Sequence, residues 1–180
     1  MILKSFTMIT ESLRMRIPNE SDVPFIFEAA KVPGFTDGLM WDAPEKMEDL
    51  IPNVAGAHEA WDKGAAYVFS MIQKENDEFA GRVVIRITKE IDRWNVGFWT
   101  VPKFQRKGYM KEALEAVVEF GFLDLDAKCI EADYAVWNKA SEMTLKTAGF
   151  TFEKCNKDGF VKNGKASDEN RMVITSLVEN

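Results

Sequence analysis

The residues whose types and spacing most clearly favour binding chemistry form a short basic loop. Gln105, Arg106, Lys107 and Gly108 follow a strand-like segment and run directly into an amphipathic segment with helical spacing. The first N–H groups of a helix lack intrahelical acceptors and carry the positive end of the helix dipole, so they bind anions. Glycine at position 108 would let a phosphate approach the backbone closely. The loop therefore predicts a pyrophosphate site, to which Arg106 and Lys107 would add charge.

The elements next to this loop are a strand before it and a helix after it. Residues 67–72, 79–87 and 94–101 read as three sequential strands with short connections, which predict an antiparallel meander. After the loop, one apolar stripe recurs at helical spacing and consists of Met110, Ala113, Leu114, Val117, Val118 and Gly121. The loop is therefore expected to join the meander to a long helix packed on the sheet.

The chain beyond this helix alternates again between strand and helix patterns. Residues 129–136 predict a strand, and Asn138 is expected to cap a short helix that ends at Gly149. Residues 150–153 and 172–177 predict two closing strands, with the polar stretch 156–170 between them.

The segment before the meander predicts one strand and two helices. Residues 13–17 alternate apolar and basic side chains, as a half-buried strand does. Asn19 or Ser21 can cap a helix that stops at Pro33 and Gly34. Residues 44–63 carry apolar side chains at helical spacing, and Pro52 is expected to kink or divide that helix.

Length and charge restrict the class of protein. With 180 residues, of which 46% are hydrophobic, the chain predicts one domain over residues 1–180, of mixed α and β class. The net charge of −6 argues against nucleic acid or an anionic membrane as the main partner. No stretch reaches the roughly 20 apolar residues of a membrane span, and no secretory signal is evident, so a cytoplasmic protein is expected.

The few cysteines and the single histidine exclude several chemistries. The two cysteines, Cys129 and Cys155, stand outside any CxxC motif. His58 is the one histidine, which excludes His-based triads and most zinc sites. The sequence therefore gives no indication of a metal.

Several motifs occur together in the order typical of one family. They are Thr10-Glu11-Ser12-Leu13-Arg14-Met15-Arg16, Gly97-Phe98-Trp99, Gln105-Arg106-Lys107-Gly108-Tyr109-Met110, Asn138-Lys139-Ala140-Ser141 and Gly149-Phe150. The whole set resembles the GCN5-related N-acetyltransferases (GNATs), whose hallmark is Gln/Arg-x-x-Gly-x-Gly/Ala, and more narrowly the RimJ/RimL-like branch. Met110 departs from the small residue of the wider family, but methionine is ordinary in this branch.

The resemblance implies a fold and a cosubstrate. The implied fold is an α/β mixed sheet, with an antiparallel meander plus a splayed pair of parallel strands, 94–101 and 129–136, flanked by helices. The implied cosubstrate is acetyl-CoA, whose pantetheine arm would lie between the splayed strands. The residues implied to bind it are Trp99, Thr100, Val101, Gln105, Arg106, Lys107, Gly108, Tyr109, Met110, Asn138 and Ser141.

The implied reaction is direct attack of a neutral primary amine on the thioester in a ternary complex. It needs an oxyanion donor and a proton for the leaving thiolate. By resemblance, Ser141 is the predicted general acid, with Tyr134 as the alternative, and the backbone N–H of Trp99 is the predicted oxyanion donor. The general base stays open among Glu131, Asp133, Asp158 and water.

The amine acceptor is also left open by the sequence. The resemblance implies that the first two helices and the late hairpin select it, and Trp41, Trp61 and Phe160 are predicted to bind it, with Asp42 nearby in the sequence. A protein N-terminus and a small-molecule amine are both compatible with this pattern. Relatives are often dimers, so a homodimer is an open expectation.

Three alternatives compete with acetyl transfer. One is a catalytically inactive CoA-binding module, which the intact loop and Ser141 disfavour. Another is a transferase for a longer acyl group. The third rests on residues 159–166, which resemble a nucleotide-binding GxxxxGK[ST] loop, but Ala166 replaces the hydroxyl residue that binds magnesium, so nucleotide hydrolysis is not expected.

Overall fold

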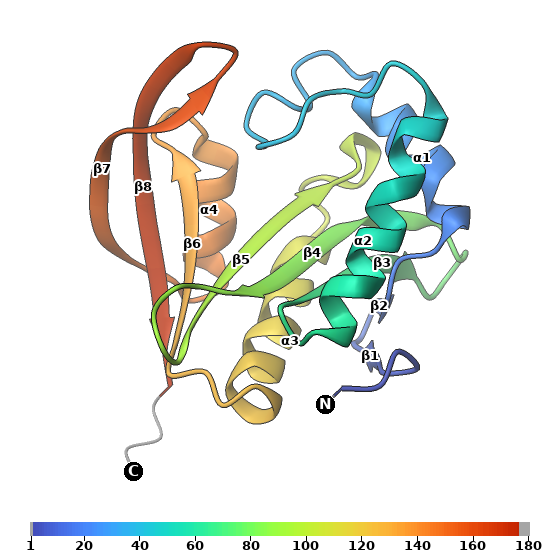
Figure 1. Ribbon diagram of the computed structural model, residues 1–180, viewed down its shortest axis with the longest axis horizontal. Coiled ribbons are helices and arrows are strands. Elements are labelled where there is room, and N and C mark those ends of the chain that lie inside the picture. The colour runs from blue at the N-terminus through green and yellow to red at the C-terminus, as the bar shows by residue number, and fades with distance from the viewer. Residues whose placement is uncertain (1, 177–180) are drawn as a thin grey trace.

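The computed structural model describes residues 2–176, which form one eight-stranded sheet with helices on both faces (Figure 1). The strands are β1 (Thr7–Ile9), β2 (Leu13–Arg16), β3 (Ala66–Gln73), β4 (Phe79–Ile87), β5 (Arg93–Thr100), β6 (Cys129–Ala135), β7 (Thr151–Lys162) and β8 (Lys165–Thr175). The helices are α1 (Val23–Ala30), α2 (Ile51–Asp62), α3 (Tyr109–Asp124) and α4 (Lys139–Thr147), with 3₁₀ turns η1 (Glu20–Asp22), η2 (Met47–Leu50) and η3 (Pro102–Phe104). The spatial order is β1-β2-β3-β4-β5-β6-β8-β7.

The first five strands pair antiparallel with their neighbours, which confirms the predicted meander of β3, β4 and β5. The alternation in β4 assigns its two faces. Val83 and Ile85 are fully buried in the core shared with α3, whereas Arg82 and Arg86 lie on the other face of the strand. This second face, with two arginines, is the one covered by α1 and α2.

The helices form two layers around the sheet. In Figure 1, α2 lies in front of β3 and β4, while α3 and α4 lie behind the sheet. The predicted stripe of α3 is confirmed, because Ala113, Leu114 and Val117 are fully buried against the sheet. The predicted helical segment 44–63 is divided at Pro52, as one of the two expectations had it, into η2 and α2. Pro52 lies in the first turn of α2, where a missing N–H costs nothing, and η2 precedes it.

The parallel pair in the middle of the sheet separates soon after it starts. β5 and β6 pair at Arg93↔Cys129, Trp94↔Ile130 and Asn95↔Glu131. Beyond this point β6 continues to pair with β8 as far as Ala135, while β5 continues along β4. The two strands visibly diverge in Figure 1. The predicted splay is confirmed.

The C-terminal part differs most from the sequence prediction. The polar stretch 156–170 belongs to the long hairpin of β7 and β8, which is broken only at Asn163 and Gly164. Most of β7 is exposed, so its side chains show no buried face that would mark a strand. Of the predicted strand 172–177, residue Leu177 lies outside the described residues.

Candidate active site

A cavity of about 550 Å³ lies beside the split between β5 and β6. Its floor is the arginine-bearing face of the sheet, including Arg82 and Gly97. Its walls come from the loop between α1 and η2, from α4 and from the β7–β8 hairpin. Segments far apart in the sequence therefore enclose one space at the point where the parallel strands separate.

Backbone alternation decides which amides of β5 face the split. The N–H of Thr88 donates to the carbonyl of Arg93 at 3.3 Å, and the N–H of Val101 donates to that of Ala80 at 2.9 Å. In an antiparallel ladder, every second residue directs its N–H and C=O to the same neighbour. Odd-numbered residues of β5, Trp99 among them, are thus directed toward β4. The backbone groups of Phe98 and Thr100 face the split instead, which corrects the assignment of Trp99 as the oxyanion donor.

The predicted anion loop is open at the start of α3. Gly108 is the residue before the helix and has φ +88°, and a Cβ placed there would meet nothing within 4 Å. Arg106 also adopts a left-handed conformation, with φ +60°. Gln105, Arg106 and Lys107 are exposed. The first N–H groups of α3 are therefore accessible to an anion, as the sequence predicts.

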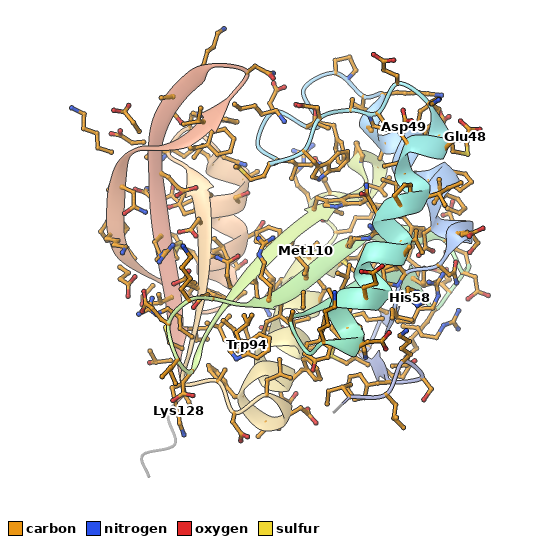
Figure 2. The ribbon with its side chains drawn as sticks, viewed as in Figure 1. Glu48, Asp49, His58, Trp94, Met110 and Lys128 are labelled. Atoms are coloured by element: carbon orange, nitrogen blue, oxygen red, sulfur yellow. The ribbon has the colours of Figure 1, made fainter. Side chains whose placement is uncertain are left out.

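Two residues of this motif are fixed by the fold rather than free for a ligand. The side chain of Met110 is 7% exposed and packs in the core, so only its backbone can face an anion (Figure 2). The Tyr109 hydroxyl donates to Gln73 Oε1 at 3.1 Å. Both contacts hold the first turn of α3 against the sheet.

The early Thr10-Glu11-Ser12-Leu13 motif serves the same helix. The Glu112 carboxylate accepts hydrogen bonds from the Thr10 hydroxyl and, at 2.6 Å, from the Ser12 N–H. Burial acts to raise the pKa of Glu112, but these hydrogen bonds outweigh burial and hold the pKa below its ordinary value. The motif therefore positions α3 instead of contacting a substrate.

Ser141 lines the cavity from the first turn of α4. Its N–H donates to Asn138 Oδ1 at 3.1 Å, which confirms Asn138 as the cap of α4. The hydroxyl of Ser141 is not needed for that cap. Tyr134, the alternative acid, is buried, and its hydroxyl accepts from Asn170 Nδ2 at 3.3 Å.

The three carboxylates considered as bases lie in different environments. Glu131 is 4% exposed and forms ion pairs with Arg93 and Arg171, both at 2.9 Å. Asp133 lines the cavity but accepts from Arg171 at 2.7 and 3.0 Å. Asp158 is exposed on the hairpin. Glu131 is therefore committed to a buried ion network, and an amine near Asp133 would compete with Arg171.

Sequence reasoning missed Glu169, a carboxylate on β8 that also lines the cavity. Burial raises its pKa, the neighbouring charge of Asp133 raises it further, and a hydrogen bond with Asn156 opposes both effects. A carboxylate with a raised pKa is better suited to accept a proton than an ordinary one. The residue lies in the polar stretch 156–170, where no periodic pattern in the sequence pointed to the cavity.

Aromatic side chains from the α1–η2 loop, β5 and the β7–β8 hairpin form part of the cavity wall. Trp41 and Trp99 line the cavity, with ring centroids 6.2 Å apart. Phe160 lines the cavity from the hairpin, and its ring centroid lies 5.9 Å from that of Trp137. Trp61 is not brought to the cavity. Its ring is 1% exposed and its Nε1 donates to the carbonyl of Ile2 at 2.8 Å, so it is a core residue.

Lys162 joins two segments that line the cavity and lie far apart in the sequence, the β7–β8 hairpin and the α1–η2 loop. Its Nζ donates to the carbonyls of Leu39 at 2.8 Å and Trp41 at 2.7 Å, and lies 2.9 Å from Asp42 Oδ1. The side chain is 13% exposed. The hairpin and the α1–η2 loop are thus joined by one cation. The sequence analysis did not single out this lysine.

Other candidate residues take no part in this cavity. His58 lies on α2, away from the split (Figure 2), and its Nε2 contacts the carbonyl of Pro18 at 2.8 Å. Within residues 2–176, no group of three His, Cys, Asp or Glu side chains could hold a metal ion. Over the same residues, no helix is long and apolar enough to cross a membrane.

Comparison with known protein families and relatives identifies the family of this chain. The family model described as an acetyltransferase (GNAT) domain matches residues 12–151. The chain belongs to the GNAT acetyltransferase family. The uncharacterized N-acetyltransferase p20 of Bacillus licheniformis is 30% identical over 107 residues of this GNAT chain, which cover 59% of the chain and 60% of p20.

Solved structures share the fold of this GNAT chain. An acetyl transferase of Salmonella typhimurium that modifies the N-terminal serine of ribosomal protein L7/L12 has a TM-score of 0.83 at 22% identity, over 93% of this chain and 96% of that one. RimJ of Mycobacterium smegmatis, solved with CoA-disulfide, has a TM-score of 0.84 at 17% identity, over 94% of this chain and 87% of that one. Both similarities show that the chain shares the fold of these two proteins.

The matched segments span 60% and 56% of the lengths of two curated Bacillus relatives.

Proposed function

We propose that this GNAT chain transfers an acetyl group from acetyl-CoA to a primary amine. One observation carries the proposal. Beyond Asn95 and Glu131 the facing edges of β5 and β6 are no longer paired with each other, a cavity with ionisable side chains lies beside them, and β5 leads through η3 to the open N-terminus of α3. This is the arrangement in which a diphosphate, an extended pantetheine arm and a thioester can be bound in sequence.

For acetyl-CoA, the diphosphate would contact the amides from Arg106 to Met110, with Gln105 beside them. The pantetheine arm would pair with the gap-facing groups of Phe98 and Thr100, whereas Trp99 would contribute its ring to the cavity wall. Asn138 and Ser141 would flank the arm from α4. The CoA-disulfide bound to the RimJ relative supports the same cosubstrate here.

For the reaction, Glu169 is proposed as the base that receives the amine proton, directly or through water. The amine nitrogen then attacks the thioester carbonyl, and the Phe98 N–H is proposed to stabilise the oxyanion. When the intermediate collapses, the C–S bond breaks, Ser141 is proposed to protonate the thiolate, and the proton that the attacking nitrogen must still lose passes to the Ser141 oxygen, directly or through water. The products are the acetylated amine and free CoA.

The acceptor is a protein N-terminus or a small-molecule amine. The Salmonella relative modifies an N-terminal serine, which supports the first class. The cavity of about 550 Å³ is of a size that holds small ligands, which keeps the second class open. We further propose one domain over the whole chain, and a homodimer remains an expectation.

The test of acetyl transfer combines binding and turnover. Calorimetry is expected to detect CoA binding, and an amine panel with acetyl-CoA is expected to release CoA and give products heavier by one acetyl group in mass spectrometry. Absence of CoA binding would overturn the proposal. Binding without turnover across peptides and small amines would support the inactive module, and faster turnover with succinyl-CoA would support a longer acyl group.

A further inference from the structure

The side chain of Arg82 points to a requirement of the acceptor. Arg82 lines the cavity from the face of β4 that does not pack on α3, opposite Trp99 on β5. Its Nε and Nη2 atoms are buried, and neither has a hydrogen-bond partner among the residues that the structure describes. Buried donors are normally paired, because leaving them unpaired costs the energy of desolvation. Two buried donor atoms of Arg82 therefore lack the hydrogen-bond acceptor that buried donors normally have.

Asp22, the carboxylate that interacts electrostatically with Arg82, does not supply this acceptor. Asp22 attracts Arg82 by charge, but its oxygens already accept from Arg16 at 2.7 and 3.1 Å, Asn19 at 3.0 Å and Ser70 at 2.7 Å. Burial lowers the pKa of Arg82 to about 10, with Asp22 opposing the shift, so the guanidinium stays charged at neutral pH. The cavity is thus lined by a cation with two donor atoms, Nε and Nη2, that have no partner among the described residues and could bind a ligand.

Charges in the cavity are separated by strand. Arg86 joins Arg82 on β4, and its Nε donates to Asn95 Oδ1 at 3.0 Å. Across the split, Asp133 on β6 and Glu169 on β8 supply negative charge. An acceptor with an amine at one end and an anion at the other would complement both sides.

We propose that Arg82 binds an anionic group of the acceptor, so that the preferred substrates are primary amines carrying a carboxylate or a phosphate. The guanidinium fork is suited to both groups. The inference rests on the proposed acetyl transfer and names its substrate class. Two sources of this chemistry fit, a free amino acid or similar small molecule, and an acidic side chain next to a peptide N-terminus.

The test uses matched pairs of amines that differ only in charge. The carboxylate pair is 4-aminobutyrate and 4-aminobutanamide, and the phosphate pair is O-phosphoethanolamine and ethanolamine. The peptide pair is Ser-Asp-Ala-amide and Ser-Asn-Ala-amide. CoA release is expected to show at least about a tenfold higher kcat/KM for the anionic member of one pair, as a charged hydrogen bond provides. The pair that discriminates identifies the source.

Substitution of Arg82 assigns the preference to this residue. Arg82→Gln is expected to remove the preference by raising KM, while the calorimetric CoA affinity stays unchanged. Arg82→Lys, which keeps the charge but not the fork, should retain part of it. Arg14→Gln is the matched control, since it removes one positive charge at the exposed pair with Asp77, outside the cavity.

Binding measurements separate this inference from the proposed reaction. Each amine is titrated into the protein saturated with CoA, so that no turnover is needed, and the anionic member is expected to bind more tightly. Equal affinity for both members of every pair, including no affinity for either, would overturn the inference. Loss of CoA binding would instead overturn the acetyl-transfer proposal. If Arg82→Gln does not fold, the wild-type comparison still decides.

Discussion

At the scale of single residues, the proposed chemistry depends on two side chains that differ in how visible they are in the sequence. Ser141 stands in a recognisable motif after Asn138, and the structure places it on the cavity. Glu169 stands in a polar stretch without periodicity and reaches the same cavity only through the pairing of β8 with β6. Motif spacing can predict the first kind of residue but not the second.

Ser141→Ala is expected to lower kcat by about 100-fold, the scale of general acid catalysis, because the thiolate would leave without a proton donor. The CoA affinity and the melting temperature should change little, since the cap of α4 comes from Asn138. Steady-state kinetics with calorimetry would check this. An unchanged kcat would assign the proton to another group.

Glu169→Gln tests the base through pH dependence. Because a base must be deprotonated, wild-type kcat/KM is expected to fall as pH drops through the raised pKa of Glu169, and the variant should lose this acidic limb along with most of its activity. The raised pKa also means that the ionised carboxylate disfavours folding, so stability falls as pH rises through that pKa. The variant should therefore be at least as stable at pH 7 in thermal denaturation. A variant that keeps the acidic limb would contradict the role.

At the scale of elements, the start of α3 is the part of the site that the sequence predicts best. Gly108→Ala is expected to weaken CoA binding by at least about tenfold, because it strains a residue at φ +88° and places a methyl group where the diphosphate would approach. Calorimetry would measure the affinity of each variant for CoA.

Gly164→Ala is the matched control for this prediction. Gly164 also has a left-handed φ, +71°, and a Cβ there would meet nothing within 4 Å, but it lies at the tip of the β7–β8 hairpin. Both substitutions should lower stability by a similar amount, and only the first should lower affinity. If the two variants had equal affinity for CoA, the proposed binding of the diphosphate at the start of α3 would be contradicted.

The success of the sequence prediction at this scale follows from burial. Elements with a buried face, such as β2, β4 and α3, show the periods of strand and helix, and their existence was predicted. The hairpin β7–β8 is largely exposed and shows no such period. Which amide of β5 faces the split depends on the hydrogen-bonding register with β4, which side-chain types do not encode. The sequence analysis therefore named the N–H of Trp99 as the oxyanion donor, although the N–H of its neighbour Phe98 is the one that faces the split.

At the scale of the whole molecule, distant segments decide the shape of the cavity. Trp41 and Trp61 both stood out by residue type, yet one lines the cavity and the other is buried in the core with Tyr67 and Phe69. Only the three-dimensional packing separates them, because aromatic residues serve cores and binding sites alike.

Lys162→Met tests the contact between the hairpin and the α1–η2 loop. The variant keeps the length of the side chain but loses its hydrogen bonds to Leu39 and Trp41. We expect KM for the amine to rise by about tenfold, as one or two hydrogen bonds from a charged group would allow, with no change in CoA affinity. Hydrogen exchange in residues 34–46 should become faster. Lys165→Met, at an exposed position of the same hairpin, should alter neither, and faster exchange in both variants would refute a specific role of Lys162.

The way Lys162 joins its two partners bears on how such a protein can acquire a new specificity. Most of the proposed CoA-binding residues lie in one stretch, from β5 to the start of α3, with Asn138 and Ser141 added from α4. The α1–η2 loop and the β7–β8 hairpin, by contrast, lie far apart in the sequence and meet at Lys162. Evolution or engineering could exchange the loop and the hairpin together. If Lys162 and the carbonyl groups that it contacts were kept, the CoA-binding residues from β5 to the start of α3 would not be disturbed. Proteins of this layout could then accept different amines while using the same acetyl donor, because different segments of the chain carry the two functions.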